Sequence, residues 1–204
     1  THTKSQMGNS STKTKGKKSK TIKKPIDKTK LDVYIKQIYF TAQLNKDRKN
    51  GMKNAKEKEL LAMISEPTNK RKKDNEFSKA SAIVNDMKAV KALECIMRYA
   101  DLLKDNEMVI QLSKGDASRI EDLVPYVESL IYGCQRSNIE CIKQLEDLLL
   151  STFGQDALEE IHTFSKVTSE MKALYASILP TEKEVKMYLI EFCNRNGLSC
   201  DKMN

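Results

Sequence analysis

Residues able to carry acid–base, nucleophilic or metal chemistry are few and scattered in this 204-residue chain. Neither His2 nor His162 has a Ser, Cys or Asp pattern around it that would orient a general base. No two of the five cysteines have the two-residue gap of a zinc or redox motif, so they are expected to be reduced thiols. No phosphate-cradling glycine loop or nucleophile elbow is present. We therefore expect a protein that is not an enzyme and needs no cofactor or catalytic metal.

The chemistry that the sequence does offer is attraction of anions by lysine. Residues 1–30 hold ten Lys against one acid, a net charge of +9 within a total of +8. Near an anionic lipid surface each Lys contributes on the order of 1 kcal/mol before screening by salt. We therefore predict that acidic membranes are bound by the lysines of this arm, namely Lys13, Lys15, Lys17, Lys18, Lys20, Lys23 and Lys24.

The composition of the arm also fits two other interpretations. The arm could be only a solubilising tail, or it could bind nucleic acid through phosphate contacts. Residues 1–30 contain neither Arg nor an aromatic residue, so bidentate guanine contacts and base stacking lack their usual side chains. The composition therefore favours lipid over nucleic acid.

A candidate lipidation site lies at the start of the arm. The segment Met7-Gly8-Asn9-Ser10-Ser11-Thr12 matches the myristoylation pattern if Met7 is the initiator, and Gly8 would carry the acyl chain. A single acyl chain anchors weakly, and a polybasic segment is the usual second signal.

The elements that must position these residues are predicted to be helices. Gly and Pro are scarce, at 7 and 4, and no clean alternation of a strand is found. Residues 1–30 are too polar to bury a core, so we predict a disordered polybasic arm followed by a helical domain over 31–204. Apolar residues at three- and four-residue spacing predict long helices over 31–65 and 76–104. A short loop between them implies an antiparallel hairpin.

Shorter helices are predicted to pack on this hairpin. They cover about 118–136, disturbed at Pro125, then a helix opened by a capping box at 137–140 and ended by Gly154, then 156–165. A turn or helix near 169–177 leads to a last helix, opened by a capping box at 181–184 and ended by Gly197. No apolar run approaches the ~18 residues of a membrane span. The predicted fold class is all-α, a long hairpin packed with several shorter C-terminal helices.

Three of these segments together resemble the N-terminal domain of the Increased Sodium Tolerance protein one family, an ESCRT-III-like group. The run from Ala89 to Leu103 is similar to the family's "EA-EILE-YC-LL" helix. The run from Val127 to Cys134 is similar to its "V-SLIYAA" segment, and the run from Val185 to Phe192, after Pro180, to its "V--YLIEIA" helix. The three occur in order at the right spacing, and the likeness extends over about 170 residues.

The resemblance implies a regulatory subunit of membrane-remodelling filaments in multivesicular body sorting, peripheral on endosomal or other acidic membranes from the cytoplasm. Family members bind a charged multivesicular body protein of the first class, form filaments with it, and modulate the AAA ATPase that dismantles ESCRT-III. The basic first helix and hairpin tip would then contact membrane or a neighbouring subunit. That set is Lys46, Arg48, Lys49, Lys53, Lys56, Lys58, Lys70, Arg71, Lys72 and Lys73.

Two features depart from the family pattern. Members usually continue into a long tail with short helical motifs that bind the ATPase, whereas this chain stops at Asn204, just past the last helix. A Lys-rich arm before the first helix is also unusual. The alternatives to a filament subunit are a soluble helical adaptor that does not polymerise, and a nucleic-acid-binding helical protein.

Overall fold

The computed structural model describes residues 25–66, 73–176 and 179–198, and within these ranges every regular element is a helix. The long helices are α1 (Lys28–Ser65) and α2 (Lys73–Asp105). The shorter elements are α3 (Glu107–Leu112), the 3-10 helix η1 (Ala117–Leu123), α4 (Val124–Arg136), α5 (Ile142–Phe153), α6 (Gln155–Ile161), α7 (Ser169–Tyr175) and α8 (Glu182–Arg195). The predicted all-α fold class is confirmed.

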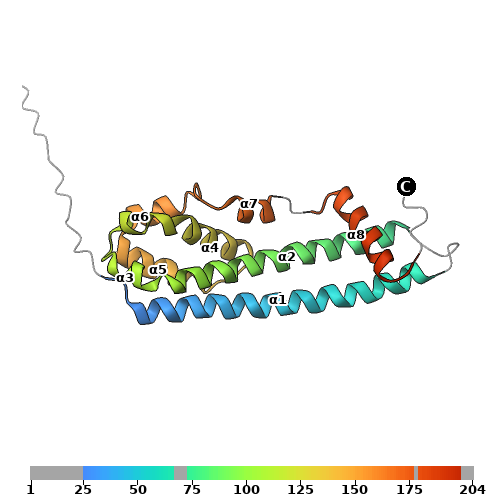
Figure 1. Ribbon diagram of the computed structural model, residues 1–204, viewed down its shortest axis with the longest axis horizontal. Helices are drawn as coiled ribbons and strands as arrows, with labels where there is room; N and C mark the ends of the chain where they lie inside the picture. Colours follow the sequence, from blue (N-terminus) through green and yellow to red (C-terminus); the bar gives the residue numbers. More distant parts are fainter. Residues whose placement is uncertain (1–24, 67–72, 177–178, 199–204) are drawn as a thin grey trace, which may run out of the picture.

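Helices α1 and α2 run antiparallel along the whole length of the molecule (Figure 1). Helices α4, α7 and α8 pack on α2, whereas α5 packs on α1 and α6 packs on α5. Helix α1 begins three residues before the predicted Leu31, because the Asp27 side chain accepts a hydrogen bond from the Lys30 amide. The preceding Ile26 is buried in the core. The helix ends at Ser65, as the Glu66–Pro67 step predicts.

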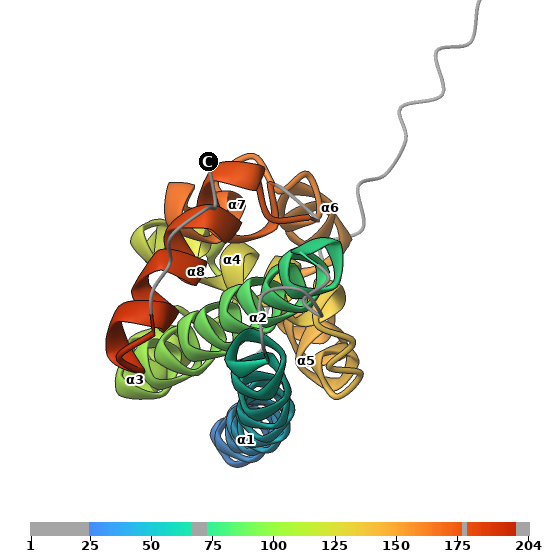
Figure 2. The same cartoon turned by 90° about the vertical axis from the view of Figure 1, so that its right-hand side faces the viewer.

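Two separate apolar clusters join the hairpin of α1 and α2 to the shorter helices that pack on it. The larger one joins the first half of α1 and the second half of α2 to α3, η1, α4, α5, α6 and α7. The smaller one, at the hairpin tip, joins Leu60 and Ile64 of α1 and three residues of α2 to α8. Figure 1 shows α8 against α2 at this end of the molecule, and Figure 2 shows it beside α2. The core is therefore divided along the hairpin.

Two local predictions for the shorter helices differ from the structure, and one short helix was missed. Pro125 lies in the first turn of α4, where no backbone donor is lost, and the non-helical residue is Ile120 in η1. The capping box predicted at 137–140 is absent, because Ser137 instead ends α4 and its hydroxyl contacts the Tyr175 hydroxyl at 2.5 Å. Helix α3 was not predicted; its six residues are too few to show a helical period.

The capping box predicted for the last helix is confirmed. The Thr181 hydroxyl accepts a hydrogen bond from the Glu184 amide at 3.3 Å, and the Glu184 carboxylate accepts one from the Thr181 amide at 2.7 Å. The two side chains satisfy backbone donors that the first turn of α8 would otherwise leave unpaired.

Substitution of two glycines by alanine tests the packing of this fold. A Cβ at Gly133 in α4 would lie 2.9 Å from Ile96 of α2 and 2.9 Å from Met171 of α7. We expect Gly133→Ala to lower the free energy of unfolding by about 1–3 kcal/mol, because the core must shift to admit the methyl group. Urea denaturation measures this change.

Gly51 in α1 is the matched control, since a Cβ there meets nothing within 4 Å. We expect Gly51→Ala to raise the free energy of unfolding by up to ~1 kcal/mol, because alanine favours a helix interior. Equal effects of the two substitutions would contradict the close approach of α4 to α2 and α7.

Candidate functional site

Three of the basic residues predicted on the first helix contact carboxylates of α2. Lys46 lies 3.7 Å from Glu94, and Lys49 and Lys56 lie 3.2 and 2.5 Å from the two carboxylate oxygens of Asp86. Asp86 is only 2% exposed, so its charge is stabilised by these two ammonium groups rather than by water. These lysines therefore help hold α1 against α2.

The other basic residues of α1 have different surroundings. Arg48 and Lys58 are exposed and Lys53 is half-buried, and none of the three lies within 4 Å of a carboxylate of a described residue. Lys73 is exposed in the first turn of α2. Lys70, Arg71, Lys72, the seven arm lysines and Gly8 lie outside the described residues. Their proposed contacts stay predictions.

Helix α8 is fixed on the hairpin tip by polar contacts around its apolar face. Lys88 of α2 lies 2.9 Å from Glu184, and the Tyr188 hydroxyl donates a hydrogen bond to Glu57 of α1 at 2.8 Å. Burial, reinforced by the Glu57 carboxylate, raises the pKa of Tyr188, so the phenol stays a donor. Arg195 lies 3.7 Å from the same carboxylate.

The outer face of α8 carries two exposed apolar side chains. Met187 is 61% exposed and Ile190 is 48% exposed, one helical turn apart. In the segment that resembles the family motif, Tyr188, Leu189 and Phe192 are buried in the tip cluster. The exposure of Met187 and Ile190 was not predicted. The signal was there: both residues lie on the face opposite Val185, Leu189 and Phe192.

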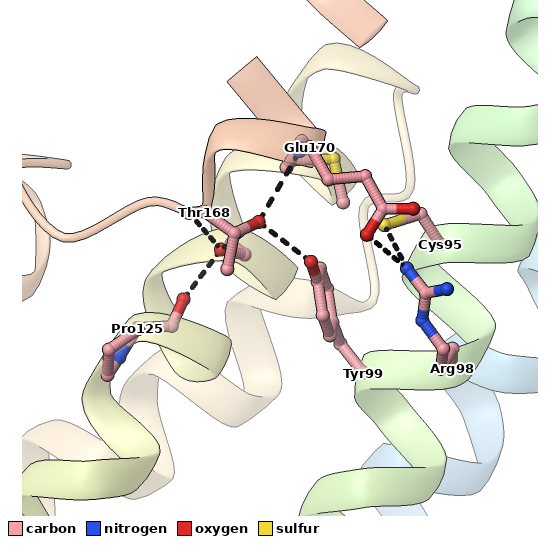
Figure 3. A network of polar contacts seen from close by, with 8 residues as sticks. Cys95, Arg98, Tyr99, Pro125, Thr168 and Glu170 are labelled. Carbon is pink, nitrogen blue, oxygen red and sulfur yellow. Dashed lines mark hydrogen bonds and ion pairs between the residues drawn. The ribbon is translucent and has the colours of Figure 1, made fainter. Parts of the chain in front are cut away.

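A polar network fastens the segment before α7 to the larger cluster (Figure 3). The Thr168 hydroxyl lies 2.7 Å from the Tyr99 hydroxyl of α2 and accepts a hydrogen bond from the Met171 amide, while the Thr168 amide donates to Ser129 of α4 at 2.9 Å. Nearby, Arg98 lies 2.5 Å from Glu170. None of these contacts was predicted, and those of Thr168 with Tyr99 and Ser129 and of Arg98 with Glu170 join residues distant in sequence.

A buried carboxylate of α4 supports the same segment. Glu128 is fully buried and accepts a hydrogen bond from the Lys166 amide at 2.7 Å. Burial raises the pKa of Glu128, the amide contact only partly opposing this.

Within the described residues 25–66, 73–176 and 179–198, no group of three or more His, Cys, Asp or Glu could hold a metal ion. His162 contacts Glu146 at 3.0 Å on the surface. None of the helices described is both long and apolar enough to cross a bilayer.

The comparison with known families gives the assignment. Residues 28–199 match the model of the Ist1 family, described as regulators of Vps4 activity in the MVB pathway. The chain belongs to the Ist1 family. The match begins at the first residue of α1 and runs past the end of α8, so it includes the hairpin and all of the shorter helices described.

Solved structures agree on the fold of this Ist1-family chain. The N-terminal domain of S. cerevisiae Ist1, in complex with the Did2 MIM motif, superimposes with a TM-score of 0.72 at 17% sequence identity. The match covers 87% of this chain and 96% of the yeast domain. No curated protein sequence matches. The predicted family and the ESCRT-III-like helical fold are both confirmed.

The attachment of α8 predicts a dependence of stability on pH. The ammonium of Lys88, followed by the Thr181 amide and hydroxyl, lowers the pKa of Glu184 from 4.5 to about 2. A lowered native pKa means that this contribution is present above about pH 4.5 and is lost as the pH falls toward about 2. We expect Glu184→Gln to lower the thermal midpoint at pH 6, by an amount that shrinks progressively below pH 4.5.

Differential scanning calorimetry across this pH range measures the effect. Glu191→Gln is the matched control, because it removes an exposed carboxylate of α8 that forms no ion pair with a described residue. If the thermal midpoint of Glu184→Gln stayed below that of the unaltered protein by a constant amount down to pH 2.5, the attachment through Lys88 would be contradicted.

Proposed function

We propose that this protein is an ESCRT-III-associated regulatory or filament subunit that acts in multivesicular body sorting and membrane remodelling. One observation carries the proposal: the family match spans the entire helical core. The proposed role has three parts, namely binding of another ESCRT-III subunit, attachment to acidic membranes, and modulation of the AAA ATPase that dismantles the filaments. The long hairpin would be the element shared with neighbouring subunits in a filament.

The partner proposed is a charged multivesicular body protein of the first class. The similar yeast domain is in complex with the Did2 MIM motif, which supports a short motif of another ESCRT-III subunit as the ligand here. Helical motifs bind by placing a few apolar anchors against an apolar surface. Met187 and Ile190 supply such a surface on α8, one turn apart and exposed. We place the docking surface there.

Substitution of this surface tests the proposal. We expect the double variant Met187→Asp, Ile190→Asp to weaken binding of a Did2 MIM peptide at least ~10-fold, because charges would replace the apolar contact. Fluorescence anisotropy of the labelled peptide measures the affinity. Both side chains are exposed, so the fold should survive, which circular dichroism checks.

Leu112→Asp on α3 is the matched control, since Leu112 is as exposed as Met187 but lies at the other end of the hairpin. An equal loss in both variants would show a nonspecific effect of surface charge. Unchanged affinity of the double variant would move the docking surface away from α8.

Attachment to acidic membranes is proposed to lie in the arm. We expect the triple variant Lys17→Gln, Lys18→Gln, Lys20→Gln to weaken binding to phosphatidylserine vesicles about 10-fold or more in low salt, and less near 0.5 M salt. Vesicle co-sedimentation measures the bound fraction.

The triple variant Lys91→Gln, Lys143→Gln, Lys183→Gln removes the same charge from exposed positions of α2, α5 and α8. It should retain most of the vesicle binding. Equal losses would show that net charge, rather than the arm, governs attachment. Binding that instead falls with Lys53→Gln, Lys58→Gln would assign the contact to the first helix.

A further inference from the structure

A pocket of about 550 Å³ opens at the middle of the hairpin. Its wall is formed by α1, by α2, by the turn after α4 and by the end of α7. It is distinct from the exposed pair on α8 and from the arm, so neither part of the proposed function accounts for it.

The pocket lies where the apolar core is interrupted. Of the described α1 residues between Ala42 and Leu60, none is buried. The pocket is lined from α1 by Asn45, Arg48, Lys49 and Met52, all within this polar stretch. Leu93 and Ala89 of α2 form an apolar wall. Polar side chains on one face thus leave a cavity that the core does not fill.

The charged side chains that line the pocket are all basic. The charged residues that line the pocket are Arg48, Lys49 and Arg136, and none of the described lining residues is acidic. Lys49 is engaged by Asp86 at 3.2 Å. Among the described residues, no carboxylate lies within 4 Å of either arginine, which leaves two guanidinium groups at one cavity without a partner anion.

The far wall is preorganised. The Arg136 guanidinium lies 3.4 Å from the ring centroid of Tyr132, which fixes its plane while leaving its N–H groups available. Ser137 and Tyr175 are joined at 2.5 Å, and the Tyr175 hydroxyl donates to the Gly133 carbonyl. Asn138 adopts a left-handed conformation, with φ of 54°, that turns the chain beside the pocket. Less side-chain ordering therefore remains to oppose ligand binding.

We propose that this pocket binds a compact polyphosphorylated ligand, an inositol polyphosphate either free or as the headgroup of a membrane lipid. Guanidinium forks bind phosphate oxygens in a bidentate way, and clustered cations require several negative charges in a small volume. The volume is in the range of small-molecule sites. A ring carrying several phosphates concentrates charge as the pocket does, and its face can rest on Leu93. An acidic peptide carries at most one charge per ~3.3–3.6 Å of extended chain, so it would spread beyond the cavity.

The test uses the full chain and inositol hexakisphosphate as the probe, in calorimetric titrations near 0.15 M salt. We expect Arg48→Gln to weaken binding about 10-fold, and Arg48→Gln with Arg136→Gln at least 100-fold, because each removes a charged fork. The double variant Arg48→Lys, Arg136→Lys keeps the charge and loses the fork, so its affinity should be intermediate. Arg48 is exposed, so the single variant keeps the test valid if Arg136→Gln perturbs the fold.

The arm also attracts polyanions, and a matched variant separates its contribution. Lys17→Gln with Lys18→Gln removes two charges outside the pocket and should change the affinity less than about threefold. The probe should raise the thermal midpoint of the unaltered protein and of the arm variant, but not of the arginine double variant, since only ligand bound to folded structure stabilises it. Equal weakening by the arm and pocket variants, or no rise of the midpoint, would overturn the proposal.

Two further arms identify the source of the phosphates. Phosphoinositide vesicles bound more tightly than phosphatidylserine vesicles, with a preference lost in Arg48→Gln, would assign the site to a lipid headgroup. If Arg48→Gln loses binding of inositol hexakisphosphate but binds both kinds of vesicle as the unaltered protein does, the ligand would be a free inositol phosphate. Either result supports the site. Displacement of the probe by an equimolar poly-glutamate peptide would overturn the choice of phosphate and assign the pocket to an acidic protein segment. The ESCRT-III role stands whichever result is obtained.

Discussion

The pairing of α1 with α2 through the buried carboxylate of Asp86 is the contact on which the rest of the structure depends. The centre of α1 is polar and cannot supply an apolar seam, so the hairpin is held there by charge. Asp86 is 2% exposed and lies between Lys49 and Lys56. Loss of both lysines would leave the carboxylate buried without a partner, which makes this contact a strong constraint on register. It aligns the two apolar clusters at the two ends of the hairpin.

The two clusters are covered in different ways. The segment before α7 is fastened to the larger cluster by neutral hydrogen bonds at Thr168 and by the buried Glu128. At the tip, α8 rests on a small apolar cluster and is fixed at its rim by Glu184 and Tyr188. The Arg98 contact of α2 with Glu170 of α7 and the Lys88 contact of α2 with Glu184 of α8 each lower the pKa of the carboxyl involved. The same helix presents Met187 and Ile190 outward, so its inner face stabilises the hairpin while its outer face is available to a partner.

Three surfaces then have separate tasks in the function that we propose. The arm supplies charge for acidic membranes, the outer face of α8 supplies apolar contact for another ESCRT-III subunit, and the central pocket supplies oriented guanidinium groups for phosphates. The separation has a physical basis. Long-range attraction by lysines needs no fixed geometry, a helical motif needs a few exposed apolar anchors, and bidentate recognition needs rigid arginines.

The sequence by itself determined the all-α class, the hairpin, the capping box of α8 and, through three ordered motifs, the family. These features follow from local periodicity, local hydrogen bonds and residue types, which act over a few residues. Only the tertiary structure decided that Lys49 and Lys56 share Asp86 and that Ser137 contacts Tyr175 rather than capping α5. It also brought Arg48 and Arg136, 88 positions apart, to one pocket. Contacts of this kind depend on how helices cross and on which side chains fail to fill the space between them, and no local pattern records either.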